Sequence, residues 1–117
     1  LFACRRMEER VLATIEEFRL LQLKVAKVLE AKLHPNADRL LVLKVDTGET
    51  QKEIVAGIAR YYSPEELVNK RVVIVDNLEP ATIRGVVSNG MVLAAQDGAT
   101  LSLMIPERPV APGAKVQ

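Results

Sequence analysis

Ile83-Arg-Gly-Val-Val-Ser-Asn-Gly-Met-Val-Leu-Ala-Ala95 passes abruptly from a polar, glycine-bearing loop to an unbroken apolar run, and we interpret the chain as built around this switch. The apolar part, Met91 to Ala95, has the length and flanking residues typical of a buried barrel strand. Gly85 and Gly90 bracket the loop before it and allow positive φ or a close approach to a ligand. Because Asn89-Gly90 is also a strong turn dipeptide, a tight turn that serves only topology is the alternative interpretation.

The length and composition of the chain indicate one globular domain. With 117 residues and 12.9 kDa it can build a single core, so we expect a tail or linker at 1–6 and one domain over 7–117. A hydrophobic content of 49% with 26% charged residues argues against disorder. No apolar run approaches the roughly 18 residues that a membrane span needs, and we expect no membrane partner.

The reactive residue types are too few for most catalytic sites. There is one cysteine and one histidine, and we expect Cys4 in the tail and His34 before Pro35 to be solvated bystanders. The 15 carboxylates form no recognisable acid/base or metal-binding motif. We therefore expect a non-catalytic protein without cofactor or metal. A lone thiol also suggests a reducing compartment, which predicts a cytoplasmic location.

The N-terminal region shows a helical pattern. Apolar residues recur at three- and four-residue spacing, which predicts an amphipathic helix; they are Met7, Val11, Leu12, Ile15 and Phe18. Thr14 and Glu17 have capping-box spacing, so a second short helix can begin there. The apolar stripe needs a cover, either the core or a subunit interface.

Alternating apolar residues and turn signals predict a series of strands after residue 22. Strands are expected at 23–33 with a bulge, at 39–46, 51–56, 71–75 and 91–95, with an extra strand at 101–105. Ser63-Pro64-Glu65-Glu66 supplies a cap, a first-turn proline and a glutamate for a short helix to about Lys70. The segment 78–88 is expected to be a long loop. The proline-rich end, 106–117, is expected to be extended and to stay bound only if Val110 and Val116 find a surface.

This element order predicts an all-β fold. Three strands, a short helix and two strands are the order of the five-stranded Greek-key barrel called the OB-fold, here with an N-terminal helix and an extended C-terminal extension. Ligands of that fold lie on strands two and three, between the loops that join strands one and two and strands four and five. In this chain those loops are 34–38 and 76–90, so the opening stretch falls at the expected mouth of the barrel.

Several short motifs also occur in a family's order: Ile15-Glu16-Glu17-Phe18, His34 to Leu40 (HPNADRL), Val55 to Ala59 (VAGIA), Ser88-Asn89-Gly90-Met91 and Ala94-Ala95. From about Glu16 to Lys115 the chain resembles the tRNA-binding domain found at the C-terminus of methionyl-tRNA synthetases and in free-standing tRNA-binding proteins. The resemblance implies a homodimer that holds tRNA by shape without anticodon preference. It also implies RNA contacts by Ser88 and Met91, and a methionyl-tRNA synthetase catalytic domain as a partner.

The residue composition restricts how RNA is held. Aromatic residues are 3% of the chain, too few for stacking platforms, so contacts to phosphate, ribose and overall shape are expected. The net charge is only +1, but residues 19–52 hold seven cations against four carboxylates, which is also compatible with an ordinary solvated face. The candidate RNA-binding residues are Ser88, Met91, Asn89, Arg84, Asn36, Arg39, Lys24, Lys27 and Lys44.

Two alternatives remain. Met91 can point into the core or toward a ribose, whereas Ser88 is expected in a solvated loop. Export-related chaperones resemble the same barrel and dimer, so a dimer that binds peptides is the competing function, followed by a purely dimerising domain.

Overall fold

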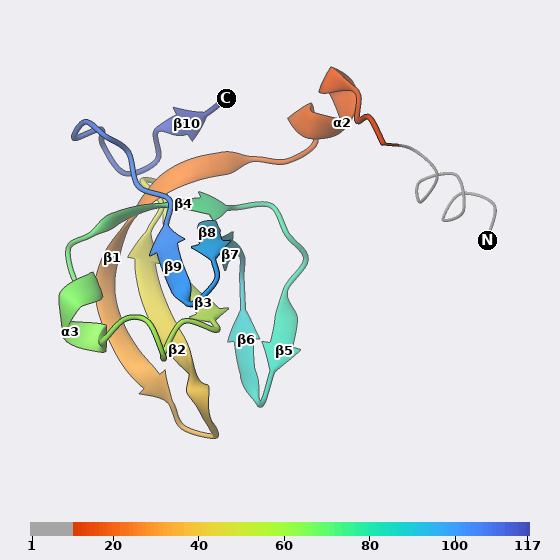
Figure 1. The fold of residues 1–117 in the computed structure, drawn as a ribbon. Coiled ribbons are helices and arrows are strands. Elements are labelled where there is room, and N and C mark those ends of the chain that lie inside the picture. The colour runs from red at the N-terminus through yellow and green to blue at the C-terminus, as the bar shows by residue number, and fades with distance from the viewer. Residues whose placement is uncertain (1–10) are drawn as a thin grey trace.

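A computed structural model describes residues 11–117. The predicted tail at 1–6, with Cys4, and the beginning of the predicted helix at Met7 lie outside the described residues. Val11 to Thr14 are not helical, which corrects the prediction of a helix running from Met7 to Phe18. Thr14 has an extended backbone because it is the N-cap of helix α2, Ile15–Arg19. The predicted capping box between Thr14 and Glu17 is confirmed. Helix α2 stands apart from the barrel and buries none of its residues (Figure 1).

The predicted all-β class is confirmed, and a long, curved strand organises it (Figure 1). Strand β1 (Leu23–His34) pairs antiparallel with β4 (Arg71–Val75) along its first half and with β2 (Ala37–Asp46) along its second half. The expected bulge is present as a register shift between Val28 and Glu30. Strand β3 (Gln51–Ala56) pairs with β2, and β7 (Met91–Val92) pairs with β4, giving the order β3-β2-β1-β4-β7.

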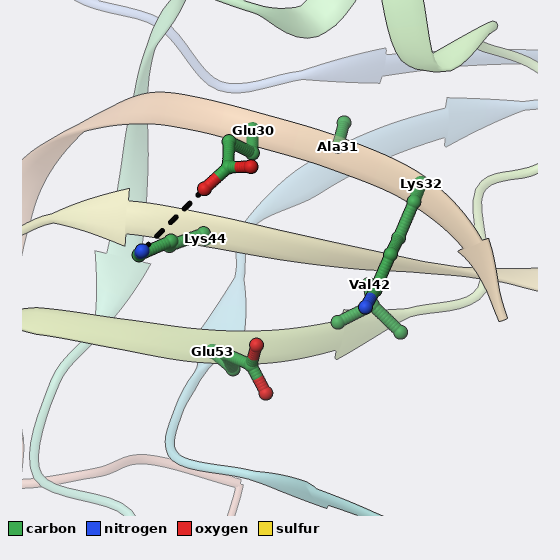
Figure 2. Close-up of a pocket in the computed structure, with 6 residues that line it drawn as sticks. All are labelled: Glu30, Ala31, Lys32, Val42, Lys44 and Glu53. Carbon is green, nitrogen blue, oxygen red and sulfur yellow. Dashed lines mark ion pairs between the residues drawn. The ribbon is translucent and has the colours of Figure 1, made fainter.

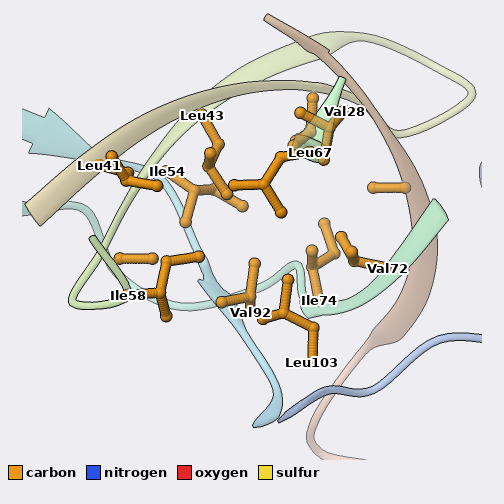
Figure 3. Packing of buried hydrophobic residues seen from close by; sticks show 13 residues of the cluster. Val28, Leu41, Leu43, Ile54, Ile58, Leu67, Val72, Ile74, Val92 and Leu103 are labelled. Atoms are coloured by element: carbon orange, nitrogen blue, oxygen red, sulfur yellow. The ribbon is translucent and has the colours of Figure 1, made fainter. Parts of the chain in front are cut away.

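The ends of this sheet meet and close a barrel around an apolar core. The amide of Asn89 donates to the carbonyl of Glu53 at 2.9 Å, which joins β3 to the segment before β7. Alternate side chains of the strands fill the interior, as period-two alternation predicts (Figure 3). The largest fully buried side chains include Leu41, Leu43, Ile54, Leu67 and Ile74. Leu67 comes from helix α3 (Pro64–Leu67), which follows the predicted N-cap Ser63 but ends before the expected Lys70.

The second half of the chain contains more strands than the three predicted for it, at 71–75, 91–95 and 101–105. The expected loop 78–88 folds into a hairpin of β5 (Ala81–Ile83) and β6 (Val86–Ser88). The expected strand at 91–95 breaks at Leu93 into β7 and β8 (Ala94–Asp97), and β8 pairs with β9 (Thr100–Leu103). The backbone of Leu93 bonds to two other segments at the break. Its amide donates to the carbonyl of Val73, and its carbonyl accepts from the amide of Met104.

The C-terminal extension is bound along the barrel. Strand β10 (Lys115–Val116) pairs with the start of β1, and the amide of Gly113 donates to the carbonyl of Val25. Gly113 and Gly48 lie against each other, and a Cβ on Gly48 would be 2.7 Å from the carbonyl oxygen of Pro112. Backbone pairing and this close approach hold the extension. Of the two side chains expected to find a surface, Val116 is half-buried in β10, whereas Val110 remains exposed.

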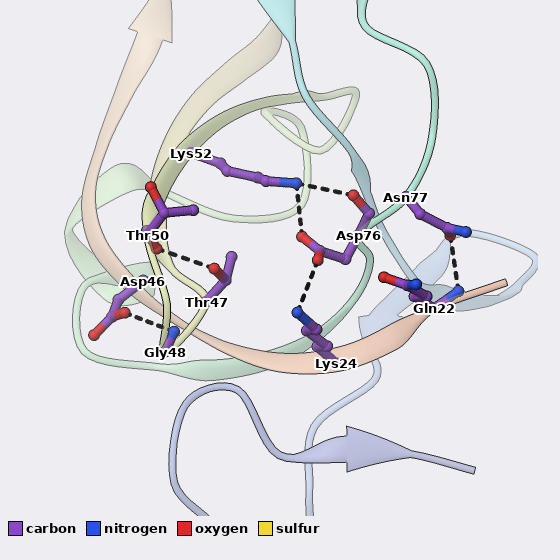
Figure 4. A network of polar contacts seen from close by, with 9 residues as sticks. All are labelled: Gln22, Lys24, Asp46, Thr47, Gly48, Thr50, Lys52, Asp76 and Asn77. Carbon is purple, nitrogen blue, oxygen red and sulfur yellow. Dashed lines mark hydrogen bonds and ion pairs between the residues drawn. The ribbon is translucent and has the colours of Figure 1, made fainter.

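A buried carboxylate fixes the barrel at the end of β4 (Figure 4). Asp76 accepts from Lys24 at 3.0 Å and from Lys52 at 2.8 Å, so it ties β1 and β3 to β4. Burial raises the pKa of the Asp76 carboxyl, but the hydrogen bonds from Lys52 and Lys24 outweigh it and hold the pKa below its ordinary 3.8. The hydrogen bond to Asp76 likewise raises the pKa of Lys24 above 10.5, against the effect of burial.

We expect this network to make stability depend on pH at both extremes. The contribution of Asp76 is complete above pH 3.8 and is lost as pH falls through its lowered native pKa. The contribution of Lys24 is complete below pH 10.5 and is lost as pH rises through its raised native pKa. Asp76→Asn should lower the free energy of unfolding by about 1 to 3 kcal/mol at pH 7. The deficit should shrink toward zero in urea titrations at progressively lower pH, and an equal deficit throughout would contradict this account.

Candidate nucleic-acid interface

His34 joins the two loops that form the mouth of the barrel. Its ring lies at the end of β1, is only 4% exposed, and has Nε2 at 3.0 Å from the carbonyl oxygen of Ile83. The amide of Asn36 donates to Nδ1 at 2.9 Å, so the two contacts together require the proton to be on Nε2. The expectation that His34 is a solvated bystander is therefore wrong. Its neighbour Pro35 made it look like a turn residue, and a single sequence offers no signal for its contact with Ile83.

Asn36 reinforces the same junction. Its side-chain amide donates to the carbonyl oxygen of Arg84 at 3.2 Å, from the turn between β1 and β2 to the hairpin β5–β6. The loops 34–38 and 76–90 therefore lie next to each other, as predicted. Asn36 therefore links the two loops, and the RNA contact expected of it stays a prediction.

A groove of about 560 Å³ lies between these loops. It is lined on one side by Ala37, Asp38, Arg39 and Leu40 and on the other by Ile83 and Arg84. Arg39 and Arg84 are both exposed, and neither has an ion pair with a described residue. The structure thus brings two of the predicted cations together across one groove, where Asp38 is the only carboxylate among the lining residues.

Arg84 occupies an unusual backbone position. It has φ 54° and is followed by Gly85 with φ 93°, so the two residues form the tip of the hairpin β5–β6. Asn or Gly is favoured at the first position of such a turn, because a Cβ at positive φ is strained. An arginine there costs stability that asparagine would avoid, which points to a role for the guanidinium.

Ser88 lies in the seam that closes the barrel and is only 3% exposed. Its hydroxyl accepts from the amide of Val55 at 2.9 Å and donates to the carbonyl of Gly90 at 3.0 Å. The hydroxyl replaces a backbone hydrogen bond between β3 and β6, which corrects the expectation of a solvated loop. Gly90, with φ 146°, allows its backbone to lie close to β4, since a Cβ there would be 2.8 Å from the carbonyl oxygen of Val75.

Met91 is on the surface. It is 38% exposed although the next residue, Val92, is buried, so the alternative in which Met91 fills the core is wrong. Asn89 is half-buried, with its backbone held by Glu53. The stretch 83–95 therefore has a structural part and an accessible part. Ser88 and Gly90 close the barrel, while Met91 remains accessible.

The three predicted strand lysines do not lie at the groove. Lys24 is held by Asp76, and Lys27 lies opposite Arg71 on the neighbouring strand β4. Lys44 lies on the outer face of β1 to β3 and pairs with Glu30 at 3.4 Å, near Lys32 and Glu53 (Figure 2). The alternating charges on that face are typical of a solvated sheet. The cationic excess of residues 19–52 is therefore divided between the groove, which Arg39 lines, and the separate positions of these lysines.

The residues that the structure describes contain no helix long and apolar enough to cross a membrane. Over the same residues, no group of three or more His, Cys, Asp or Glu side chains is arranged to hold a metal ion. The fold and the groove between loops define a small β-barrel binding module.

Comparisons with known proteins agree with that class. A family model described as a putative tRNA binding domain matches residues 23–115. The methionine–tRNA ligase of Pyrococcus horikoshii is 53% identical over 102 residues, which is 87% of this chain but 14% of that protein. The chain belongs to the family of putative tRNA-binding domains, a non-catalytic module, and spans only a small part of the curated relatives that it matches.

Two solved structures have the same fold. The MetRS related protein from Pyrococcus horikoshii matches with a TM-score of 0.86 and 35% identity, covering 92% of this chain and 100% of the other. The chaperone CsaA from Bacillus anthracis matches with a TM-score of 0.83 and 28% identity over the same shares. The predicted family is confirmed, and the competing chaperone class has the same architecture.

Proposed function

We propose that this domain binds tRNA at the groove between the loops 34–38 and 76–90. The observation that carries the proposal is the pair of exposed guanidinium groups of Arg39 and Arg84 on opposite sides of that groove, in a chain of this family. Arginine suits phosphate because its planar fork donates two parallel hydrogen bonds. His34 and Asn36 fix the distance between the two loops and so pre-organise the groove.

Within this proposal the Ser-x-Gly-Met motif has divided roles. Ser88 positions the loop from inside the barrel, because both hydrogen bonds of its hydroxyl are intramolecular. Met91 and Asn89 lie at its accessible side and contact ribose or the RNA backbone. The lining of the groove includes no aromatic residue, so binding depends on charge and shape and is indifferent to the anticodon.

Salt dependence tests the proposed mode of binding. If about three to five phosphates are neutralised, affinity for tRNA should fall at least roughly a hundredfold between 50 and 300 mM salt. Filter binding with two tRNAs of different anticodon should give the same affinity and the same slope. A flat response to salt, or a strong preference for one anticodon, would contradict phosphate-based recognition.

We infer that the domain acts as a homodimer. Helix α2 and the segment after it leave apolar side chains exposed, namely Ile15 (53%), Phe18 (44%), Leu20 (73%) and Leu21 (45%). A second copy is the proposed cover, and two RNA sites on one body raise the effective concentration of the second contact. Sedimentation should give twice the 12.9 kDa of the chain, and a monomer at micromolar concentration would exclude this arrangement.

We propose that the domain assists a methionyl-tRNA synthetase by binding tRNA, as a C-terminal accessory domain or as a separate subunit. The proposed location is the cytoplasm. Its matches to methionine–tRNA ligases support this assignment. The second candidate, a peptide-binding chaperone, is favoured by the match to CsaA. Co-purification separates the two, since a tRNA-binding protein should carry an excess of absorbance at 260 nm and a peptide-binding one should not.

A further inference from the structure

A second cationic pocket lies where the start of β4 meets the chain after β9. It has a volume of about 240 Å³, and its charged lining residues are Lys70, Arg71, Glu107 and Arg108. Three cations face one carboxylate there. None of the three has an ion pair with any residue from 11 to 117, although the ammonium of Lys70 lies 5.7 Å from the centre of the Tyr62 ring.

Two further features of this pocket are unfavourable in the free protein. The Nε of Arg71 is buried and has no hydrogen-bond partner among the described residues, which costs free energy. Lys27 lies directly opposite Arg71 in the pairing of β1 with β4, and like charges in that position are destabilising. Asp46, opposite Lys27 in the pairing of β1 with β2, offsets this repulsion in part. An anion in the pocket would offset the positive charge that remains.

We propose that this pocket binds a phosphodiester of the RNA backbone, at a site separate from the groove. The volume fits a phosphate group, none of the lining residues is aromatic, and the lining includes the guanidinium of Arg71, a group that suits a phosphate oxygen. Lys27, which the sequence singled out as an RNA contact, acts beside this pocket through its charge.

The two sites lie toward opposite parts of strand β1. Arg71 is paired with Lys27, whereas the groove adjoins His34, seven residues further along the strand. At the rise of a β-strand this separation is roughly 20 Å, so an RNA helix can engage both while the barrel stays rigid. The inference rests on the proposed function, since it assigns a second contact to the same RNA.

Neutralising single residues of the pocket tests the proposal. Arg108→Gln and Arg71→Met should each weaken tRNA binding about five- to tenfold at 0.1 M salt and lower the magnitude of the salt slope by about one. Glu107→Gln should strengthen binding severalfold. Glu65→Gln is its matched control, because it changes the net charge equally on exposed helix α3, and it should have less than a twofold effect.

Thermal unfolding distinguishes the site from a structural cluster. Arg71→Met should unfold at the same or a higher temperature, because it removes an unpaired buried donor; a lower temperature with unchanged tRNA affinity would show a structural role and overturn the proposal. Unchanged affinity and salt slope in Arg108→Gln and Arg71→Met would overturn the proposal as well. If the parent protein still bound tRNA in that case, the proposed function would be unaffected. A parent protein that binds no tRNA would instead overturn the proposed function itself.

Discussion

Replacing Ser88 by alanine is expected to lower the free energy of unfolding by about 2 to 4 kcal/mol. The hydroxyl serves two backbone groups in a seam that is closed to water, the amide of Val55 and the carbonyl of Gly90. Alanine leaves both without a partner, and each buried group so left costs about 1 to 3 kcal/mol. A chemical denaturation curve of the purified variant measures the loss.

Ser102→Ala is the matched control for this experiment. Ser102 is exposed, and its hydroxyl has only a long contact of 3.4 Å to the carbonyl of Leu103, so its loss should change stability by less than about 0.5 kcal/mol. If Ser88→Ala were as stable as Ser102→Ala but bound tRNA more weakly, the hydroxyl would be an RNA contact and the seam would close without it. The expected order is the reverse, with tRNA affinity nearly unchanged at temperatures where the variant remains folded.

The strands could be predicted because each has a buried face. Gln51–Ala56 and Arg71–Val75 were predicted with the observed bounds, since a short apolar run and turn or polar residues at both ends define each strand locally. The hairpin of β5 and β6 was missed because each of its strands has three residues and the turn carries Arg84 where Asn or Gly is expected. Without Asn or Gly at its first position, this turn lacks the residue that normally indicates a two-residue hairpin.

The position of the candidate groove could be predicted, but the contacts that hold it could not. Loop order in the barrel placed the loops 34–38 and 76–90 next to each other, and the groove between them agrees. The structural roles of His34 and Ser88 depend on distant partners. His34 contacts Ile83, 49 positions away, and Ser88 contacts Val55, 33 positions away. Periodicity and spacing report on near neighbours, so neither contact had a local signal. The ion pair of Lys24 had no local signal either, because its partner Asp76 follows β4, 52 positions away in the chain.

Removing both groove arginines is expected to have the largest effect on binding. The double variant Arg39→Gln with Arg84→Asn should weaken tRNA binding about fifty- to a hundredfold at 0.1 M salt, because each arginine that neutralises one phosphate is worth about eightfold there. Its salt slope should fall by about two in magnitude. Stability should be kept or slightly increased, since Asn accepts the positive φ of position 84 better than Arg does.

Lys44→Gln gives the comparison that locates the RNA. It removes the same charge as Arg39→Gln but from the outer face of β1 to β3, where Lys44 already pairs with Glu30. We expect less than a threefold loss of affinity, because screening beyond about 10 Å leaves little long-range attraction at this salt concentration. If Lys44→Gln instead weakened binding more than Arg39→Gln, the RNA would lie along the strands, and the groove would be a feature of the loops alone. Equal slopes in parent and double variant would lead to the same conclusion, since a lost phosphate contact must appear in the release of counterions.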